Sequence, residues 1–163
     1  MNELMIRDFQ QDETETLVRI AVAAWEPVYA EYRRVMGEAI FNAMYPDWQD
    51  DKARQIRSAC RPDRTGRVLV AELSGKVVGF VTFYERRYPG VAEIGNNAVH
   101  PDYQNRGIAA CLYERVFDEL RATGIRFVKV ETGGDPTHAP ARRAYEKVGF
   151  DRSYPSVTYF REL

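Results

Sequence analysis

The residues best suited to chemistry lie between Gln104 and Ala110, where a polar turn leads into a helical pattern. The first backbone N–H groups of a helix lack intrahelical partners and carry the positive end of the helix dipole. Gly107 has no Cβ and Ala109 has a small one, so a bulky anion can approach these amides closely. Arg106 adds a positive charge beside them. The segment therefore predicts a binding site for a diphosphate group.

Other chemistries fit the chain less well. The segment lacks the lysine and Ser/Thr of a Walker loop and the three spaced glycines of a dinucleotide fingerprint, which argues against ATP and NAD. His100 and His138 are the only histidines, and they share no metal-ligand spacing with each other or with the two cysteines, so we expect no metal. Spacing alone leaves open an ordinary helix that has a glycine near its start.

The elements that must position this turn follow from hydrophobic periodicity. The Ser74-Gly75 dipeptide predicts a hairpin turn, Gly124 the end of a helix, and Pro27 a break or kink in the first helix. We expect strands at 4–9, 67–73, 77–84, 91–99, 127–132 and 157–160, and helices at 12–35, 48–60, 108–123 and 140–148. This order predicts a mixed α/β fold with a central sheet flanked by helices. With no linker or repeat, residues 1–163 are expected to form a single domain.

Composition narrows the function classes. The formal net charge of -1 does not favour a general nucleic-acid binder, which usually carries a basic excess. No apolar run approaches the roughly 18 residues of a membrane span, and the first residues do not resemble a signal peptide. Two cysteines cannot form a disulfide framework and are expected to be reduced. We therefore expect a cytoplasmic protein with neither nucleic acid nor membrane as a partner.

Two motifs resemble those of one known family. Gln104-x-x-Gly107-x-Ala109, following a Val-His-Pro sequence, resembles the cofactor motif of the GNAT superfamily of N-acetyltransferases. Residues 141–150 resemble its second signature, a helix that carries a tyrosine, here Tyr145, and closes with Gly-Phe. The resemblance covers about residues 67–160. It implies a GNAT-like central, mostly antiparallel sheet of six to seven strands, and acetyl-CoA as the co-substrate without a metal.

The same resemblance implies how acetyl-CoA is held. The pantetheine arm is expected to pair with the strand edge at Ala98 and Val99. His138 stands where the family often has an asparagine, seven residues before the tyrosine, and an imidazole can also donate to a cofactor carbonyl. The pyrophosphate is expected to contact the backbone of Gln104, Asn105, Arg106, Gly107, Ile108, Ala109 and Ala110.

Acetyl transfer to an amine needs the neutral amine. At pH 7 an amine with a pKa near 10.4 is about one part in a few thousand neutral, which costs about 4–5 kcal/mol unless a base helps. The resemblance implies that Tyr145 is the general acid for the departing thiolate; the alternative is a tyrosine that only packs the core.

Glu93 is the leading candidate for the base. Strand alternation places its side chain on the same face as Val99, six residues later. The histone-modifying branch of the family has a glutamate base at this position. Glu131 is the reserve candidate, a water relay is a further route, and a solvated carboxylate is the alternative. Asn96 and Asn97 are expected near the acetyl group.

The acceptor is expected to meet the N-terminal helices and the loop at 84–91. Trp25 and Tyr29, with Tyr32 and two glutamates nearby, form an aromatic group suited to a cationic amine. The alternative is that these rings cover the flank of the sheet. The C-terminal residues 157–160 weakly resemble acetyltransferases of polyamine-like or aminoglycoside substrates.

The resulting hypothesis is an acyltransferase that moves the acetyl group of acetyl-CoA to a primary amine of a small molecule or peptide, by direct attack in a ternary complex. The alternatives are a non-catalytic acetyl-CoA sensor and a protein or peptide N-acetyltransferase. Members of the family often dimerise, so a homodimer is an open expectation.

Overall fold

The computed structural model describes residues 3–163, apart from the side chains of Arg86 and Arg87. Its centre is a five-stranded sheet in the order β1-β2-β3-β4-β5. The strands are β1 (Leu4–Asp8), β2 (Arg67–Leu73), β3 (Lys76–Tyr88), β4 (Val91–Val99) and β5 (Phe127–Val130). The helices are α1 (Thr14–Met44), α2 (Trp48–Ala59), α3 (Ile108–Ala122) and α4 (Ala139–Lys147), with short 3-10 turns η1 (Gln11–Glu13), η2 (Pro101–Tyr103) and η3 (Pro136–His138).

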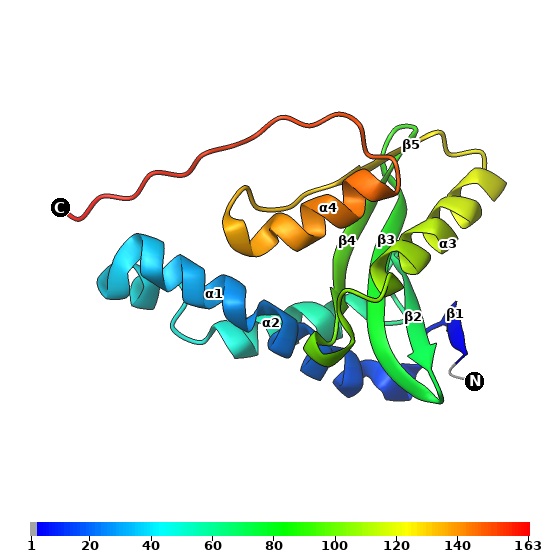
Figure 1. Ribbon diagram of the computed structural model, residues 1–163, viewed down its shortest axis with the longest axis horizontal. Coiled ribbons are helices and arrows are strands. Elements are labelled where there is room, and N and C mark those ends of the chain that lie inside the picture. The colour runs from blue at the N-terminus through cyan, green and yellow to red at the C-terminus, as the bar shows by residue number, and fades with distance from the viewer. Residues whose placement is uncertain (1–2) are drawn as a thin grey trace.

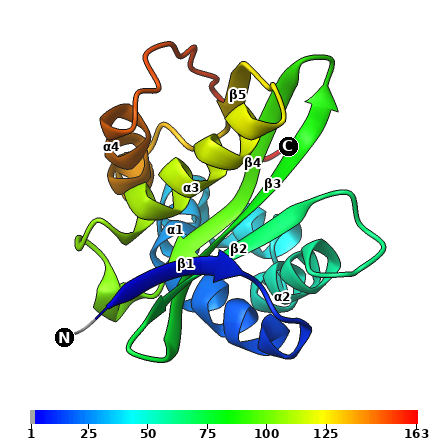
Figure 2. The ribbon, with the colours of Figure 1, turned by 90° about the vertical axis from the view of Figure 1, so that its right-hand side faces the viewer.

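Helices cover both faces of this sheet (Figure 1, Figure 2). On one face, α3 and α4 pack on the alternate apolar residues of β2, β3 and β4, such as Leu69, Val81 and Ile94. On the other face, α1 and α2 pack on Val70 and Phe80. Because strand side chains alternate between faces, one strand supplies both cores. The predicted mixed α/β class is confirmed.

A β-bulge interrupts β4 near its middle. Val81 of β3 pairs with Asn97 and Phe83 pairs with Ile94, so two residues of β4, Gly95 and Asn96, stand opposite one residue of β3. Gly95 lies in this bulge, where an added Cβ would come within 2.7 Å of the Thr82 hydroxyl. The extra residue reverses the alternation. Glu93 and Val99 therefore lie on opposite faces, and the prediction that they share one face is wrong.

β4 also has an open edge. β5 runs parallel to β4 and pairs with it only from Val91 to Ile94. Beyond that point β5 ends, while β4 continues to Val99 with β3 on one side. An extended ligand can add itself to such an edge as a strand does.

The first helix does not break where the sequence predicts. α1 continues through Pro27, and its backbone departs from helical geometry at Gly37, with φ 80° and ψ 161°. Pro27 is exposed, so the hydrogen bond that it removes leaves a carbonyl that water can reach. Gly37 adopts a conformation that residues with a Cβ avoid. The bend therefore lies ten residues later than the proline.

The predicted strand at 157–160 is absent from the described residues. Residues 151–163 form neither helix nor strand, and every one of them is exposed. Figure 1 shows this segment running from the end of α4 to the far left of the view, away from β5. A strand needs a partner edge to satisfy its backbone, and the segment meets none. The sheet thus has five strands instead of six to seven.

None of the helices in residues 3–163 combines the length and apolar character needed to cross a membrane.

Candidate functional site

Short-range hydrogen bonds close the turn between β4 and α3. The side-chain amide of Gln104 donates to the carbonyl of Val99 at 3.0 Å. The guanidinium of Arg106 donates to the carbonyl of Asp102 at 2.9 Å, and the backbone N–H of Asp102 donates to Nδ1 of His100 at 3.3 Å. The predicted cofactor residues Gln104 and Arg106 therefore also brace the turn itself.

The N-terminus of α3 presents open backbone donors. Asn105 and Gly107 both have left-handed backbones, with φ of 61° and 79°. Gly107 is the N-cap residue and no side chain caps the helix. An added Cβ at Gly107 would meet no atom within 4 Å, so the space beside these amides is free. An uncapped helix start of this kind can bind an anion, and the binding of a pyrophosphate at Ile108, Ala109 and Ala110 stays a prediction.

Tyr145 lies at the end of a buried network that joins three elements. Its hydroxyl accepts a hydrogen bond from Nδ2 of Asn97 at 3.2 Å. The hydroxyl of Tyr113, on α3, donates to Oδ1 of the same asparagine at 2.7 Å. Asn97 also donates to the carbonyl of Gly95 at 3.2 Å, which ties the network to the bulge. The bulge of β4 therefore sets where Tyr145 can point.

Burial raises the pKa of the Tyr145 hydroxyl, and the hydrogen bonds with Asn97 and Tyr113 offset only part of that rise. The phenol stays protonated near neutral pH, as a proton donor requires. Burial also raises the pKa of Tyr113. Tyr113 was not among the predicted site residues because its spacing on α3 is that of a core residue. The available signal was its hydroxyl, since a buried tyrosine needs a hydrogen-bond partner.

The two candidate bases, Glu93 and Glu131, both lie near the ammonium of Lys129. Glu131 lies 2.6 Å from the Lys129 ammonium, its side chain is 75% exposed, and its pKa is lowered by that hydrogen bond. Glu93 lies 3.8 Å from the same ammonium, and its side chain is 18% exposed. Glu93 is thus the more enclosed carboxylate, on the face opposite Ile94. Among residues 3–163 no three His, Cys, Asp or Glu side chains gather in a way that could hold a metal ion.

The predicted acceptor residues belong to a larger group of rings between α1, α2 and η3. Trp25 and Tyr29 are 6.1 Å apart between ring centroids, and Tyr29 stacks on Trp48 at 4.3 Å. Tyr32 lies 5.9 Å from Tyr45. We call these five rings, together with His138, the aromatic cluster. Tyr45 and Trp48 were not predicted, because only tertiary packing brings α2 beside α1.

Lys52 carries a buried ammonium into the aromatic cluster. Its side chain is on α2, the residue is 5% exposed, and its Nζ lies 3.6 Å from the centroid of the Trp25 ring. Nζ donates to the amide oxygen of Gln55 at 2.8 Å. Burial lowers the pKa of Lys52 to about 8. The rings of this cluster can therefore hold a cation with little water around it.

His138 connects the aromatic cluster to the start of α4. Its Nδ1 lies 2.5 Å from Oδ2 of Asp135. The centroid of its ring lies 5.8 Å from that of Trp25, in an edge-on arrangement, and 6.3 Å from that of Tyr32. Gly133 leaves room for this pair, since an added Cβ would lie 2.4 Å from Nδ1. The sequence placed His138 on the cofactor side; in the fold its ring also faces the predicted acceptor residues.

Comparisons with known proteins identify related sequences. The family described as the acetyltransferase (GNAT) family matches residues 25–150. An IAA acetyltransferase of Azospirillum brasilense is 32% identical over 117 residues, 71% of this chain and 72% of that protein. The [ribosomal protein bS18]-alanine N-acetyltransferase of Escherichia coli K12 is 33% identical over 69 residues, 42% of this chain. The match spans 45% of that enzyme's length.

Solved structures share the fold at low identity. The crystal structure of the PaiA N-acetyltransferase from Thermoplasma acidophilum in complex with coenzyme A has a TM-score of 0.72 and 18% identity, over 91% of this chain and 90% of that one. The aminoglycoside acetyltransferase AAC(6')-Iy in complex with a bisubstrate analogue has a TM-score of 0.66 and 17% identity, over 99% of each chain. The open β4 edge, the uncapped α3 and the family match lead to one conclusion: the chain belongs to the acetyltransferase (GNAT) family.

Proposed function

We propose that this acetyltransferase moves the acetyl group of acetyl-CoA to a primary amine of a small cationic molecule, by direct attack while both substrates are bound. The observation that carries the proposal is the position of Tyr145. Its buried hydroxyl is held by Asn97, on the stretch of β4 whose outer edge is open. A thioester aligned along that edge would bring its sulfur toward a protonated phenol.

The donor would be bound mainly by backbone groups. The pyrophosphate would accept hydrogen bonds from the amides of Gly107, Ile108, Ala109 and Ala110, with Asn105 shaping the turn. The pantetheine arm would pair with β4 near Ala98 and Val99. Nε2 of His138 is the ring nitrogen left to meet a cofactor carbonyl, since Nδ1 lies against Asp135.

The chemical step needs one proton acceptor and one proton donor. Glu93 would take a proton from the incoming ammonium, directly or through water, so that the neutral amine attacks the thioester carbonyl carbon. The carbon–sulfur bond breaks, Tyr145 gives its proton to the departing sulfur, and the second proton lost by the nitrogen returns Tyr145 to its phenol form. The products are an amide and a free thiol. Glu93 suits the base role better than Glu131 because its side chain is 18% exposed, whereas that of Glu131 is 75% exposed.

The aromatic cluster supports a cationic acceptor. The Lys52 ammonium on the face of Trp25 shows that these rings accommodate a cation, and Asp135 lies near Tyr32, His138 and the Glu31 carboxylate. Aromatic faces with nearby carboxylates attract ammonium groups and bind neutral amines poorly. Trp25 and Tyr29 would therefore contact the acceptor.

A second candidate is acetylation of a peptide amine. The partial similarity to the bS18-alanine N-acetyltransferase favours it. The two candidates predict different acceptors, because a small-molecule enzyme acts on free polyamines and aminoglycosides, whereas a peptide enzyme acts on N-terminal alanine peptides and ignores free amines.

The test is release of free thiol from acetyl-CoA in the presence of a panel of amines and peptides. Acceptor-dependent release with cationic small amines, confirmed by the mass of the acetylated product, is the expected result. Release with peptides alone would replace the small-molecule acceptor by the second candidate. Binding of acetyl-CoA by calorimetry, with no release for any acceptor, would instead support a non-catalytic sensor.

A further inference from the structure

Asp135 and His138 form a close pair at the start of α4. Nδ1 of His138 lies 2.5 Å from Oδ2 of Asp135. The His138 side chain is buried, so water does not compete strongly for this contact. The partner of one ring nitrogen decides which nitrogen carries the proton, and therefore what the other nitrogen can bind.

The Asp135 carboxylate is held as an anion. Its Oδ1 accepts a hydrogen bond from the backbone N–H of Thr137 at 2.9 Å and another from the Thr137 hydroxyl. Burial alone would raise the pKa of Asp135, but the hydrogen bonds from Thr137 and His138 outweigh burial and lower that pKa. An ionised carboxylate can only accept hydrogen bonds, so Nδ1 of His138 must be a donor.

The proton on Nδ1 limits what Nε2 can do. A neutral imidazole has a single N–H, so with the proton on Nδ1 the other nitrogen has only a lone pair. A carbonyl oxygen also only accepts hydrogen bonds. Nε2 of His138 can therefore donate to a cofactor carbonyl only when the ring carries a second proton and is an imidazolium. An asparagine amide in the same place would donate at any pH.

The loop before α4 keeps Asp135 in this orientation. Arg142, in the first turn of α4, donates from Nη1 to the carbonyl of Gly133 at 2.6 Å and to the carbonyl of Asp135 at 2.8 Å. A Cβ at Gly133 would collide with both the carboxylate and the imidazole, so the loop passes close to the pair only because this residue is glycine. The carboxylate is thus fixed where it keeps the proton on Nδ1.

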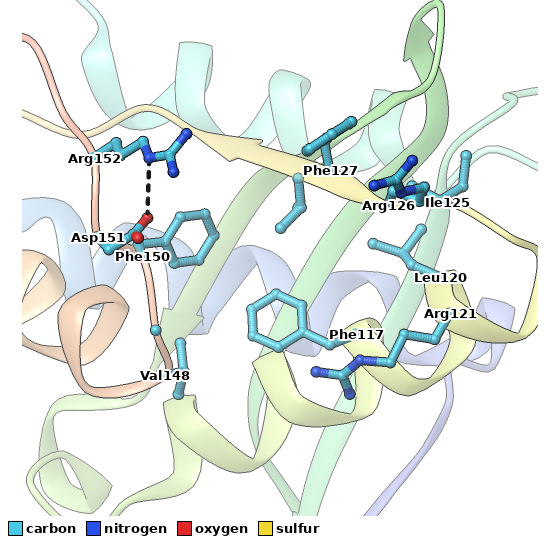
Figure 3. A pocket seen from close by; sticks show the side chains of 12 residues that line it. Phe117, Leu120, Arg121, Ile125, Arg126, Phe127, Val148, Phe150, Asp151 and Arg152 are labelled. Carbon is cyan, nitrogen blue, oxygen red and sulfur yellow. Dashed lines mark ion pairs between the residues drawn. The ribbon is translucent and has the colours of Figure 1, made fainter.

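The far end of α4 is anchored as well. Phe150, which follows α4, lies 5.9 Å from Phe117 of α3 and 5.7 Å from Tyr145 between ring centroids. Figure 3 shows Phe150 and Phe117 on the wall of a pocket beside α3. His138 and Tyr145 therefore stand at the start and near the end of one helix that is held at both ends.

The groups around the His138 ring show what stabilises a charge there. Asp135 on η3 is in direct contact, and an anion so close favours the charged form of a histidine. Tyr32 on α1 stacks on the ring at 6.3 Å between centroids, and burial together with the Asp135 charge raises its pKa to about 12, so this phenol is neutral. Further charged groups in this region are Glu31 of α1, whose carboxylate interacts with that of Asp135, Arg142 of α4, and Lys52 of α2 against Trp25.

We propose that His138 binds the pantetheine arm as an imidazolium, and that binding of coenzyme A therefore takes up a proton at Nε2. Asp135 is the positioning residue, because it keeps the first proton on Nδ1. This proposal rests on the proposed function, in which His138 meets a cofactor carbonyl. An ordinary histidine is uncharged above about pH 7.5, so in that range the second proton comes from the solvent as coenzyme A binds.

The first experiment counts protons. Calorimetry of coenzyme A binding at about pH 8, in two buffers with different heats of ionisation, gives the number of protons taken up. We expect the unaltered protein to take up about one proton more than His138→Asn, whose amide donates without titrating. Protons exchanged by the phosphates of coenzyme A appear in both proteins and cancel in the comparison.

The second experiment follows affinity against pH. A ligand that binds together with a proton binds more weakly as the pH rises. Between about pH 7.5 and pH 9, the affinity of the unaltered protein for coenzyme A should fall relative to that of His138→Asn by up to about tenfold per pH unit. An unchanged ratio of the two affinities across this range would contradict proton uptake at His138.

Asp135→Asn tests the positioning role. Its amide oxygen can still accept from Thr137, but the neutral ring of His138 is then free to carry its single proton on Nε2. We expect this variant to bind coenzyme A without the extra proton, and thermal unfolding checks that both variants are folded.

Two results would overturn the proposal. One is equal proton uptake by the unaltered protein and His138→Asn, as expected if Nε2 accepts from an amide N–H of the arm. The other is an Asp135→Asn variant that retains the extra proton. If none of the three proteins bound coenzyme A, the donor site of the proposed function would itself be wrong, and the proposal would fall with it.

Discussion

The N-terminus of α3 and the aromatic cluster are the two parts of the proposed site, and they are built in different ways. The first comes from one contiguous stretch, and the side-chain hydrogen bonds of Gln104 and Arg106 reach residues no more than five positions away. The second joins Trp25 to His138 across more than half the chain. Binding by backbone amides needs only a local turn, whereas a group of rings needs the whole fold to bring them together.

The two parts also differ in charge. The first turn of α3 has no acidic residue, so nothing there repels an anion. The aromatic cluster encloses the ammonium of Lys52 and lies beside the Asp135 carboxylate. The first part therefore suits the proposed diphosphate, and the second has the aromatic faces and the carboxylate expected for the proposed amine. The following experiments separate the two, from the largest expected effect to the smallest.

The first prediction concerns the backbone donors of α3. Gly107→Val should weaken coenzyme A binding about 1,000-fold, or about 4 kcal/mol, because a β-branched side chain is strained at φ 79° and enters the open space beside the amides. That loss corresponds to two charge-assisted hydrogen bonds of about 2 kcal/mol each. Isothermal calorimetry measures the affinity.

The matched control for that change is Gly124→Val, which has the same φ of 79° at the other end of α3. It should lower the free energy of unfolding and leave the coenzyme A affinity unchanged. Equal losses of affinity in both variants would show that strain, and not blocked donors, explains the effect.

The second prediction tests the buried ammonium of the aromatic cluster. Burial lowers the pKa of Lys52 to about 8 from a usual value of 10.5, so the unfolded chain binds more protons than the folded one between these pH values. The free energy of unfolding should therefore rise by about 3 kcal/mol as the pH increases from 8 to 10.5. Urea unfolding measured across this range detects the rise.

Lys52→Met should remove that rise and unfold with a higher free energy than the unaltered protein at pH 7. The control Lys147→Met removes an exposed ammonium and should keep the rise. If the pH dependence persists in Lys52→Met, a group other than Lys52 causes it.

The third prediction concerns proton donation. Tyr145→Phe should lower kcat about 100-fold with little change in coenzyme A affinity, because it removes the proposed proton donor. Tyr113→Phe removes a hydroxyl that contacts Asn97, and should lower kcat only about tenfold through misplacement of that side chain. Steady-state thiol release measures both. Equal losses would make Tyr145 a positioning residue instead of the acid.

The fourth prediction returns to the acceptor. Trp25→Leu should raise the KM for a cationic amine about tenfold, as expected for loss of a cation–π contact, and leave the KM for acetyl-CoA unchanged. Trp25→Phe retains an aromatic face, so its KM for the cationic amine should stay close to that of the unaltered protein. An equal rise in both KM values would mean that Trp25 supports the fold of the site and does not contact the amine.

Local patterns predicted much of the framework. The helix at 48–60 and the strands at 67–73 and 91–99 match α2, β2 and β4 to within a residue, because periodicity and turn residues act over short distances. The bend in α1 was misplaced, since Pro27 is tolerated on an exposed face and Gly37 adopts a conformation closed to other residues. The prediction of a strand at 157–160 was also wrong, because strand propensity cannot supply a partner edge.

The candidate site likewise has features that the sequence predicted and features that it did not. The donors near Gly107 could be read from one stretch, but the bulge at Gly95 could not, and it moved Glu93 to the opposite face from Val99. Tyr113 looked like a core residue until the fold brought its hydroxyl to Asn97. The choice of Glu93 as base remains a prediction, as do the contacts of Trp25 and Tyr29 with an acceptor.

What the sequence by itself determined was the uncapped start of α3, because a glycine, small neighbours and a polar turn act within a few residues of one another. Tertiary structure alone decided where Tyr145 points, which rings surround Lys52 and which edge of the sheet stays open. Those properties depend on contacts between segments distant in the chain, and their energies depend on burial that no local pattern specifies.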